Sequence, residues 1–393
     1  MIPRETFDRG RYSNRVFSGS LSALWKQNCS GEFECESSAP GRINLIGEHT
    51  DYNQGFVFPA AISRRTRGLF RISTRMNLYS NPIGPAANLQ NFDNIPTRGW
   101  TRYVAACAHA IRDELNAFPP LLEGVLDSDL PSGSGLSSSA ALEICLISAW
   151  NALCKFNLTP EKIAEIAWIA ETRYVGVNCG KMDQLAVACG KRAHAMFIDT
   201  RSLQFEHVPI PAGIALVVLD TCKSRALAAS AYNERVAQCR SAAETLGKTS
   251  LRDATLHELE SARKRGMDET VYKRARHVIT ENERVLQFRV ALQEADFKKI
   301  GELCRQSHES LRNDYNVSSP ELDAMARSAW NAPGCIAARL TGAGFGGCCV
   351  ALVHSDKFKN FERSVKASYG MYAFPVPAIW RVDADDGAKA FLR

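Results

Sequence analysis

The fold and the chemistry of this chain depend most on one stretch, Pro131-Ser132-Gly133-Ser134-Gly135-Leu136-Ser137-Ser138-Ser139-Ala140-Ala141-Leu142-Glu143. Its two glycines allow the backbone to bend close to a ligand, and its hydroxyl side chains precede an apolar run that predicts a helix. The N–H groups and the dipole at the N-terminus of such a helix attract anions. The stretch therefore fits a loop that binds phosphate. Taken alone, it fits equally well a turn that only caps a helix.

Two other glycine patterns indicate which nucleotide sites the chain lacks. A Walker A motif requires a Lys after its glycines, and this stretch has none. In Gly247-Lys248-Thr249, the leading glycine of that motif is replaced by Ala242. Gly342-Ala343-Gly344-Phe345-Gly346-Gly347 matches the dinucleotide pattern GxGxxG, but it leads into the apolar run 348–353, a predicted strand and not a helix. A nicotinamide-binding dehydrogenase is therefore disfavoured. A glycine-rich strand–turn–strand close to a phosphate loop fits better.

A third segment gathers polar and ionisable side chains around a predicted turn. Residues 40–53 are Pro-Gly-Arg-Ile-Asn-Leu-Ile-Gly-Glu-His-Thr-Asp-Tyr-Asn. Glu48, His49 and Asp51 fall close together there, where hydrogen-bonding groups that converge would recognise a polyhydroxylated ligand. A surface loop with ordinary charges is the simpler interpretation. Metal binding by His49 has no support, because no second His lies at ligand spacing.

A fourth segment, residues 176–184, places Asp183 in a glycine-flanked loop directly after a helix that carries Glu171. A carboxylate in such a loop suits a general base. A single Asp in a loop is more often only a turn residue. Both interpretations stay open on these residues alone.

Composition and charge exclude several classes of protein. The 393 residues include 48 basic and 42 acidic side chains, and the excess of +6 is dispersed, which argues against a nucleic-acid binder. No stretch is apolar enough for a membrane span, and residues 1–9 lack the apolar run of a signal peptide. The thirteen cysteines show no CxxC pairing, which indicates buried, reduced thiols. We therefore expect a soluble, cytoplasmic protein that mixes helices and strands.

Periodicity and capping signals predict the elements between these motifs. Residues 81–99 are predicted to form a loop, and a domain boundary is expected near 190–207. The expected strands are 56–62, 66–72, 213–219, 335–338 and 347–353, and the expected helices are 101–115, 160–175, 226–246, much of 256–312 and one that begins at Ser319-Pro320.

The motifs occur in the order found in the GHMP superfamily of sugar kinases, and the chain most closely resembles the galactokinase family. Residues 40–53 resemble the galactokinase signature, 131–143 the phosphate-binding loop, and 341–348 the third glycine-rich motif. Residues 307–323 also resemble a galactokinase segment, so that the resemblance extends from about residue 40 to 350.

This resemblance implies an α+β fold of two domains with the active site between them. Residues 1–205 would form an N-terminal domain like the second domain of ribosomal protein S5, carrying the sugar signature and the phosphate-binding loop. Residues 206–393 would form a ferredoxin-like C-terminal domain.

The resemblance also implies ATP-dependent phosphorylation of the C1 hydroxyl of D-galactose. Asp183 would be the general base with Arg42 beside it, and Ser139 with Glu171 would hold Mg²⁺. Trp100 would border the adenine pocket. The implied galactose contacts are Arg42, Glu48, His49, Asp51, Gly180, Asp183 and Tyr232, and the implied ATP contacts in the loop are Gly133, Ser134, Gly135, Leu136, Ser137, Ser138 and Ser139.

The alternatives change the sugar or remove the catalysis. The same chemistry on N-acetylgalactosamine or a uronic acid stays open, because Lys181 stands where the family usually has an apolar residue, and Ser63-Arg64-Arg65 replaces a stretch that often contains Asp. A catalytically silent sugar sensor would be expected to have a damaged phosphate loop or base, and both are intact here. The expected partners are galactose and ATP, without nucleic acid or membrane, and we expect a monomer.

Overall fold

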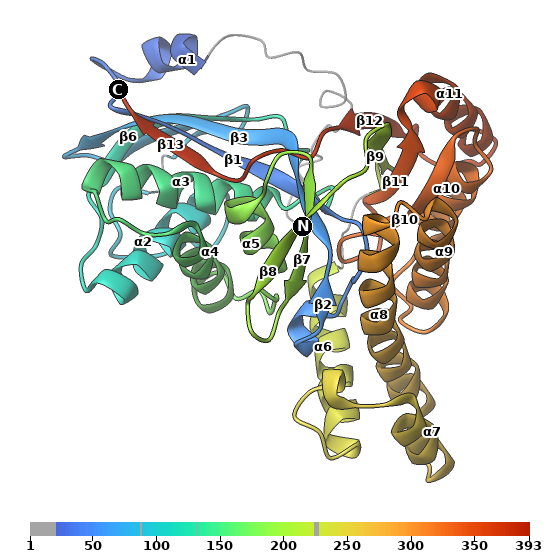
Figure 1. Cartoon of the computed structure of the whole chain (residues 1–393). Coiled ribbons are helices and arrows are strands. Elements are labelled where there is room, and N and C mark those ends of the chain that lie inside the picture. Colours follow the sequence, from blue (N-terminus) through green and yellow to red (C-terminus); the bar gives the residue numbers. More distant parts are fainter. Residues whose placement is uncertain (1–20, 87–88, 132, 224–227) are drawn as a thin grey trace, which may run out of the picture.

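The computed structural model describes residues 21–86, 89–131, 133–223 and 228–393, which form an α+β structure (Figure 1). One six-stranded sheet has the order β13 (Lys389–Leu392), β1 (Cys35–Asn44), β3 (Pro59–Ser73), β6 (Leu121–Ser128), β4 (Asn77–Asn81) and β5 (Gly84–Pro85). A four-stranded sheet has the order β10 (Cys335–Thr341), β11 (Cys348–His354), β9 (Ile214–Asp220) and β12 (Ala378–Val382). A small sheet contains β2 (Phe56–Val57), β7 (His194–Asp199) and β8 (Phe205–Pro209).

The six-stranded sheet is apolar on both faces because successive side chains of a strand point to opposite sides. Phe70 and Leu126 face a core shared with four helices, whereas the neighbouring Leu69 and Val125 pack against Trp25 on the other side. Figure 1 shows the four helices below the sheet and α1 above it. The four are α2 (Thr101–Leu115), α3 (Ser138–Cys154), α4 (Pro160–Ile169) and α5 (Met182–Cys189), and α1 is Leu21–Asn28.

The four-stranded sheet is likewise buried on both faces, as the apolar run 213–219 predicted. On β9, Val217 and Leu219 pack into a core with the C-terminal helices, whereas Leu216 and Val218 join a second cluster that includes Ile43. That second cluster draws residues from both sheets, so the two parts of the chain share one apolar core. The helices here are α6 (Ala228–Thr245), α7 (Leu256–Lys264), α8 (Glu269–Gln293), α9 (Phe297–Asn313), α10 (Pro320–Trp330) and α11 (Phe358–Tyr369).

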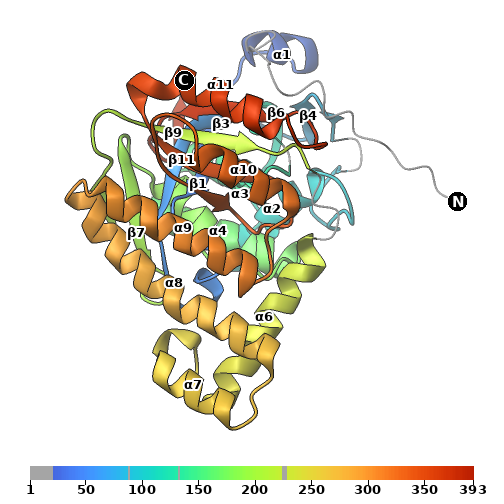
Figure 2. The same ribbon diagram turned by 90° about the vertical axis from the view of Figure 1, so that its right-hand side faces the viewer.

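The long helices α8 and α9 run side by side, and α7 lies against the far end of α8 (Figure 2). They confirm the helical prediction for much of 256–312. The predicted helix 226–246 is described from Ala228 as α6, and its predicted start at Ala226 lies outside the described residues.

Helix starts read from capping signals are confirmed. The Thr159 side chain accepts a hydrogen bond from the backbone N–H of Lys162, and Pro160 is the first residue of α4, where its missing N–H costs nothing. Ser319 caps α10 in the same way. These caps are local, which explains why sequence alone located them.

The predicted break between the strands 56–62 and 66–72 is wrong, because β3 runs through Ser63-Arg64-Arg65 and the interruption lies instead at Phe58, between β2 and β3. The polar stretch suggested an interruption, but its charges are bound by the C-terminal segment. Arg65 donates a hydrogen bond to the carbonyl oxygen of Gly387 at 2.7 Å, and the Arg64 guanidinium lies 4.6 Å from the centre of the Trp380 ring. Arg64 and Arg65, which belong to the stretch that departs from the family pattern, thus contact the C-terminal segment.

The predicted division into residues 1–205 and 206–393 differs from the sheets at two points. Strand β8 begins at Phe205, the last residue of the predicted first part, and pairs with β7, and the C-terminal strand β13 returns to pair with β1. By pairing with β1, β13 covers an edge of the first sheet that would otherwise be exposed. The chain therefore passes from the small sheet to the four-stranded sheet between β8 and β9, and it returns to the six-stranded sheet after β12.

The thirteen cysteines lie in the described part of the chain as thiols, and eight of them are buried. Burial of those eight confirms the interpretation of them as packing residues. In the described residues, no helix combines the length and the apolar character needed to cross a membrane.

We expect Phe70→Ala to lower the free energy of unfolding by about 3–5 kcal/mol, because the fully buried ring would leave a cavity. The ring fills the space beside Gly68 and Gly124, where an added Cβ would lie 2.4 Å and 2.5 Å from ring atoms. Urea unfolding followed by circular dichroism measures the loss. The control Phe391→Ala, at a side chain that is 62% exposed, should cost less than about 1 kcal/mol. Equal losses in the two variants would contradict this account of the core.

Candidate active site

The loop that precedes α3 has the backbone of an anion site. Gly133, Gly135 and Ser137 adopt left-handed conformations with φ of 70°, 87° and 58°. Ser137 is the cap residue of α3, yet its side chain forms no capping hydrogen bond with the helix. The N–H groups of the first turn therefore keep their capacity to bind a ligand, and the helix dipole favours an anion there.

Asp183 was predicted to lie in a loop, but it is in the first turn of α5, from which it connects the phosphate loop to β1. Nε and Nη2 of Arg42 donate to the two carboxylate oxygens of Asp183 at 2.7 Å each, and Arg42 Nη1 donates to the carbonyl oxygen of Gly135 at 2.5 Å. Ser137 Oγ donates to Asp183 Oδ2 at 2.5 Å. A register shift in β1 between Pro40 and Arg42 accompanies this arrangement, and such irregularities commonly redirect side chains near sites.

The charges around Arg42 favour its ionised form. Burial alone would lower the pKa of the guanidinium, but Asp183, Glu48 and Asp51 raise the pKa of Arg42 above its ordinary value. Burial, followed by the charge of Asp183, raises the pKa of Asp51 to about 7. Gly180 packs directly on this carboxyl group, because an added Cβ would lie 2.3 Å from Asp51 Oδ2. The structure thus brings Arg42, Glu48, Asp51, Gly180 and Asp183 together, beside Gly135 and Ser137 of the loop.

His49 is fully engaged within the protein. Its Nε2 lies 3.2 Å from the carbonyl oxygen of Ala343, which can only accept, and its Nδ1 lies 2.8 Å from the hydroxyl of Tyr52. Burial lowers the pKa of His49 to about 3, so the neutral ring donates from Nε2 and accepts at Nδ1. The Tyr52 hydroxyl also lies 2.7 Å from that of Tyr315. The centre of the His49 ring lies 5.5 Å from that of Tyr232 and 4.7 Å from that of Tyr315.

Glu171 lies in a π-helical turn, Ala170–Tyr174, that continues α4, and such turns are frequent at functional sites. Ser139 Oγ donates to Glu171 Oε1 at 2.8 Å, and Gln184 Nε2 donates to Glu171 Oε2 at 2.6 Å. Burial raises the pKa of Glu171 to about 7. The predicted pair of Ser139 and Glu171 is therefore adjacent. No described residue forms an ion pair with this carboxylate, although the charge of Arg42 opposes part of the rise in its pKa.

The chemistry of these oxygen donors fits Mg²⁺. A hydroxyl and a carboxylate are hard ligands, and this ion usually takes its others from phosphate and water. One turn along α3 from Ser139, Glu143 is fully buried, and neither of its carboxylate oxygens has a hydrogen-bond partner among the described residues. Burial and the charge of Glu171 raise the pKa of Glu143 well above its ordinary value. A cation beside Glu171 would supply the positive charge that these carboxyl groups lack.

The glycine segment 342–347 connects the antiparallel strands β10 and β11, as the strand–turn–strand prediction required. Gly342 N–H donates to Glu48 Oε1 at 2.7 Å, and Ala343 accepts from His49. The turn therefore lies against the polar segment 40–53. It opens no helix, which excludes the dinucleotide interpretation.

Two further residues from the sequence analysis, Trp100 and Lys181, lie at the edge of the site. Trp100 immediately precedes α2 and packs at the edge of the first core, so its contact with adenine stays a prediction. Lys181 Nζ lies 4.5 Å from the centre of the Trp168 ring and 3.9 Å from Glu165. The Lys181 side chain thus points toward α4, where its ammonium group contacts Trp168 and Glu165.

Sequence reasoning missed Glu143 and Gln184 as neighbours of the Ser139–Glu171 pair. The signal for Glu143 was present, because residues i and i+4 of a helix share a face. Gln184 had no such signal, since its contact with Glu171 depends on how α5 packs against α4.

Comparison with known protein families agrees with this geometry. The galactokinase galactose-binding signature matches residues 26–72, the GHMP kinases N-terminal domain matches 102–191, and the GHMP kinases C-terminal domain matches 288–370.

Similar proteins extend the match over most of the chain. Galactokinase of Roseiflexus sp. (strain RS-1) is 40% identical over 89% of this chain and 91% of its own length, and galactokinase of Staphylococcus carnosus is 38% identical over 91% and 95%. The structure of Lactococcus lactis galactokinase complexed with galactose superposes with a TM-score of 0.87, at 34% identity over 94% of this chain and 99% of that one. Methanococcus jannaschii mevalonate kinase, at 18% identity over 91% and 99%, shares the fold with a TM-score of 0.63. The chain belongs to the galactokinase family of the GHMP kinases.

Proposed function

We propose that this chain transfers the γ-phosphoryl group of ATP to the C1 hydroxyl of galactose. The observation that carries the proposal is the position of Asp183, which is bound by Arg42 from segment 40–53 and by Ser137 from the phosphate loop. We call residues 40–53 the sugar segment and residues 133–139 the phosphate loop. A carboxylate between the two is placed to act on a hydroxyl that attacks a phosphoryl group. The family of the chain, and the galactose in the related Lactococcus lactis structure, support galactose as the sugar.

In this mechanism Asp183 accepts the proton of the C1 hydroxyl as general base. Arg42, which holds the carboxylate in a bidentate pair, faces the charge that builds on the transferred group. The uncapped N–H groups at the start of α3 bind ATP phosphates. Mg²⁺ held by Ser139 and Glu171 would neutralise phosphate charge when bound, and positioning supplies most of the remaining catalysis.

The sugar hydroxyls would meet Glu48, Asp51, the backbone at Gly180 and Tyr232. Burial raises the pKa of Tyr232 well above its ordinary value, and the charge of Asp51 is the largest of the neighbouring charges that add to this rise. Such a site rejects a sugar that leaves one of these buried polar groups unpaired. The thiol state of the cysteines is consistent with a reducing cytoplasm. One chain supplies the whole set of site residues, which is consistent with a monomer.

Coupled ATP consumption with galactose, N-acetylgalactosamine, glucose, arabinose and galacturonate tests the proposal directly. We expect turnover with galactose to exceed turnover with the others. Absence of turnover with all five sugars would sink the kinase proposal, and a preference for N-acetylgalactosamine or galacturonate would replace the sugar while retaining the chemistry.

Asp183→Asn should lower kcat by about 10²–10⁴-fold, because the amide cannot accept the proton. ATP binding should be retained, since Asp183 does not belong to the phosphate loop. Initial rates and titration with a fluorescent ATP analogue separate the two effects. Asp356→Asn, at a side chain that is 71% exposed, is the control. An Asp183→Asn enzyme with unimpaired kcat would remove Asp183 from the mechanism.

Ser139→Ala should raise the Mg²⁺ concentration needed for half-maximal rate by about tenfold or more, because one ligand of the cation is lost. Titration of Mg²⁺ at fixed ATP and galactose measures the change. Ser148→Ala, a buried change in the same helix, should leave that concentration as it is. Identical Mg²⁺ dependence in the two variants would count against the metal assignment.

Asp51→Asn should raise the KM for galactose and also change how stability depends on pH. The folded state keeps the Asp51 proton up to about pH 7, whereas the unfolded chain loses it near pH 4. Between these values the native state binds more protons, so the wild-type stability falls as pH rises, and Asn removes this effect. From pH 5 to pH 8 we expect the wild type to lose about 2–3 kcal/mol relative to the variant in urea unfolding. Parallel stability curves would show that Asp51 does not titrate in this range.

A further inference from the structure

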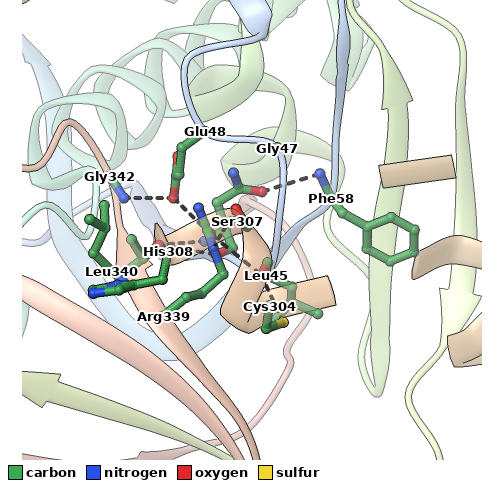
Figure 3. A network of polar contacts seen from close by, with 12 residues as sticks. Leu45, Gly47, Glu48, Phe58, Cys304, Ser307, His308, Arg339, Leu340 and Gly342 are labelled. Carbon is green, nitrogen blue, oxygen red and sulfur yellow. Dashed lines mark hydrogen bonds and ion pairs between the residues drawn. The ribbon is translucent and has the colours of Figure 1, made fainter. Parts of the chain in front are cut away.

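A buried cluster of charges connects the sugar segment, residues 40–53, to the second sheet, and Figure 3 shows two of its members, Glu48 and Arg339. It consists of Glu48 after β1, Glu281 and Arg284 on α8, and Arg339 on β10. Glu281 and Arg339 are fully buried, and Glu48 is 2% exposed. The two acids and two arginines balance in charge, as buried ions must to avoid a large desolvation cost. We call these four residues the charge cluster.

Arg339 is the member that contacts the sugar segment most extensively. Its Nη1 lies 3.3 Å from Glu48 Oε1, and it donates to the carbonyl oxygens of Asn44 at 3.3 Å and Leu45 at 3.4 Å. Its Nε donates to Ser307 Oγ at 3.2 Å. Because a guanidinium is planar and its donors are fixed relative to one another, these contacts determine the position of the Glu48 carboxylate relative to the end of β1.

The same oxygen of Glu48 is bound a second time from the second sheet. Gly342 N–H donates to Oε1 at 2.7 Å, whereas no described residue donates a hydrogen bond to Oε2. The backbone around Glu48 is held as well, since Gly47 N–H donates to Glu281 Oε1 at 3.0 Å. Protein donors thus occupy one carboxylate oxygen and leave the other for a ligand.

Resting on the proposed function, in which Glu48 binds a galactose hydroxyl, we propose that Arg339 is a positioning residue for sugar recognition that acts through Glu48. It fixes Oε1, and thereby aims Oε2 at the sugar. The phosphate loop is held instead by Arg42, through Gly135. A change at Arg339 therefore acts on galactose and spares ATP.

Steady-state kinetics of Arg339→Lys test this proposal. Lysine keeps the charge but loses the fork of donors, so we expect the KM for galactose to rise about tenfold while kcat and the KM for ATP change by less than about threefold. Arg274→Lys is the matched control. Arg274 is a buried arginine on α8 that donates to Gln238 and to the carbonyl oxygen of Asp314, away from the sugar segment. It should leave the galactose KM within about twofold.

A merely structural role would lower the melting temperature and the fraction of active enzyme without moving the galactose KM. That result for Arg339→Lys would overturn the inference while the proposed function stands. Absence of galactose phosphorylation by the wild type would instead overturn the proposed function, and an unchanged galactose KM in Glu48→Gln would overturn the assignment of Glu48 to the sugar on which the inference rests.

A charge-balanced variant covers the case in which Arg339→Lys fails to fold. Glu48→Gln combined with Arg339→Met removes one charge of each sign from the charge cluster. If Arg339 acts through Glu48, the double variant should have the galactose KM of Glu48→Gln alone, within about twofold. A further rise of tenfold or more would show that Arg339 acts by another route.

Discussion

The bidentate pair between Arg42 and Asp183 is the interaction on which the site depends. It joins a residue of the first sheet to one at the start of α5, and 141 positions separate them along the chain. The same guanidinium binds the carbonyl oxygen of Gly135, so the phosphate loop is tied to the pair. The Arg42 side chain is buried and that of Asp183 is partly exposed, and such an ion pair is seldom a large source of stability, but loss of one partner leaves an unpaired charge. The pair therefore fixes geometry, and the rest of the fold must supply the stability that it does not.

That stability comes largely from the apolar cluster that both sheets share. Ile43 and Phe58 from the first part pack with Leu216 and Val350 from the second. Side chains in such a core are packed at crystal-like density, so the parts they join have little freedom to shift. Segment 40–53 leaves β1 at this core and turns back beside the β10–β11 turn. Its polar groups are thus positioned before any ligand arrives, which is what electrostatic catalysis requires.

The sequence revealed those features whose cause is local. Thr159 and Ser319 mark helix starts, because a cap acts over three residues. The glycine loop at 133–135 was found for the same reason, whereas Asp183, predicted to lie in a loop, is in the first turn of α5. The family resemblance then assigned roles that the residues alone left open.

Features whose cause lies far along the chain were missed or misjudged. The polar stretch at 63–65 suggested a break in β3, because its partners near residue 387 were not visible. Arg339 directly follows the predicted strand 335–338, and its partner Glu48 is 291 positions away. Gln184 and the π-helical turn at Glu171 likewise depend on packing between elements. Burial of charge, which decides all of these contacts, has no local signature.

The same burial explains why the ionised forms of two acids in the site are more favourable when a ligand is bound than when none is bound. The pKa of Asp51 and the pKa of Glu171 are each raised to about 7, chiefly by burial. In the empty protein each carboxyl group must keep its proton or bear an uncompensated charge. A donor hydroxyl beside Asp51, or a cation beside Glu171, reverses that balance. A ligand therefore stabilises carboxyl groups that are unfavourable without it. Residues that lower the stability of the fold can for this reason favour function.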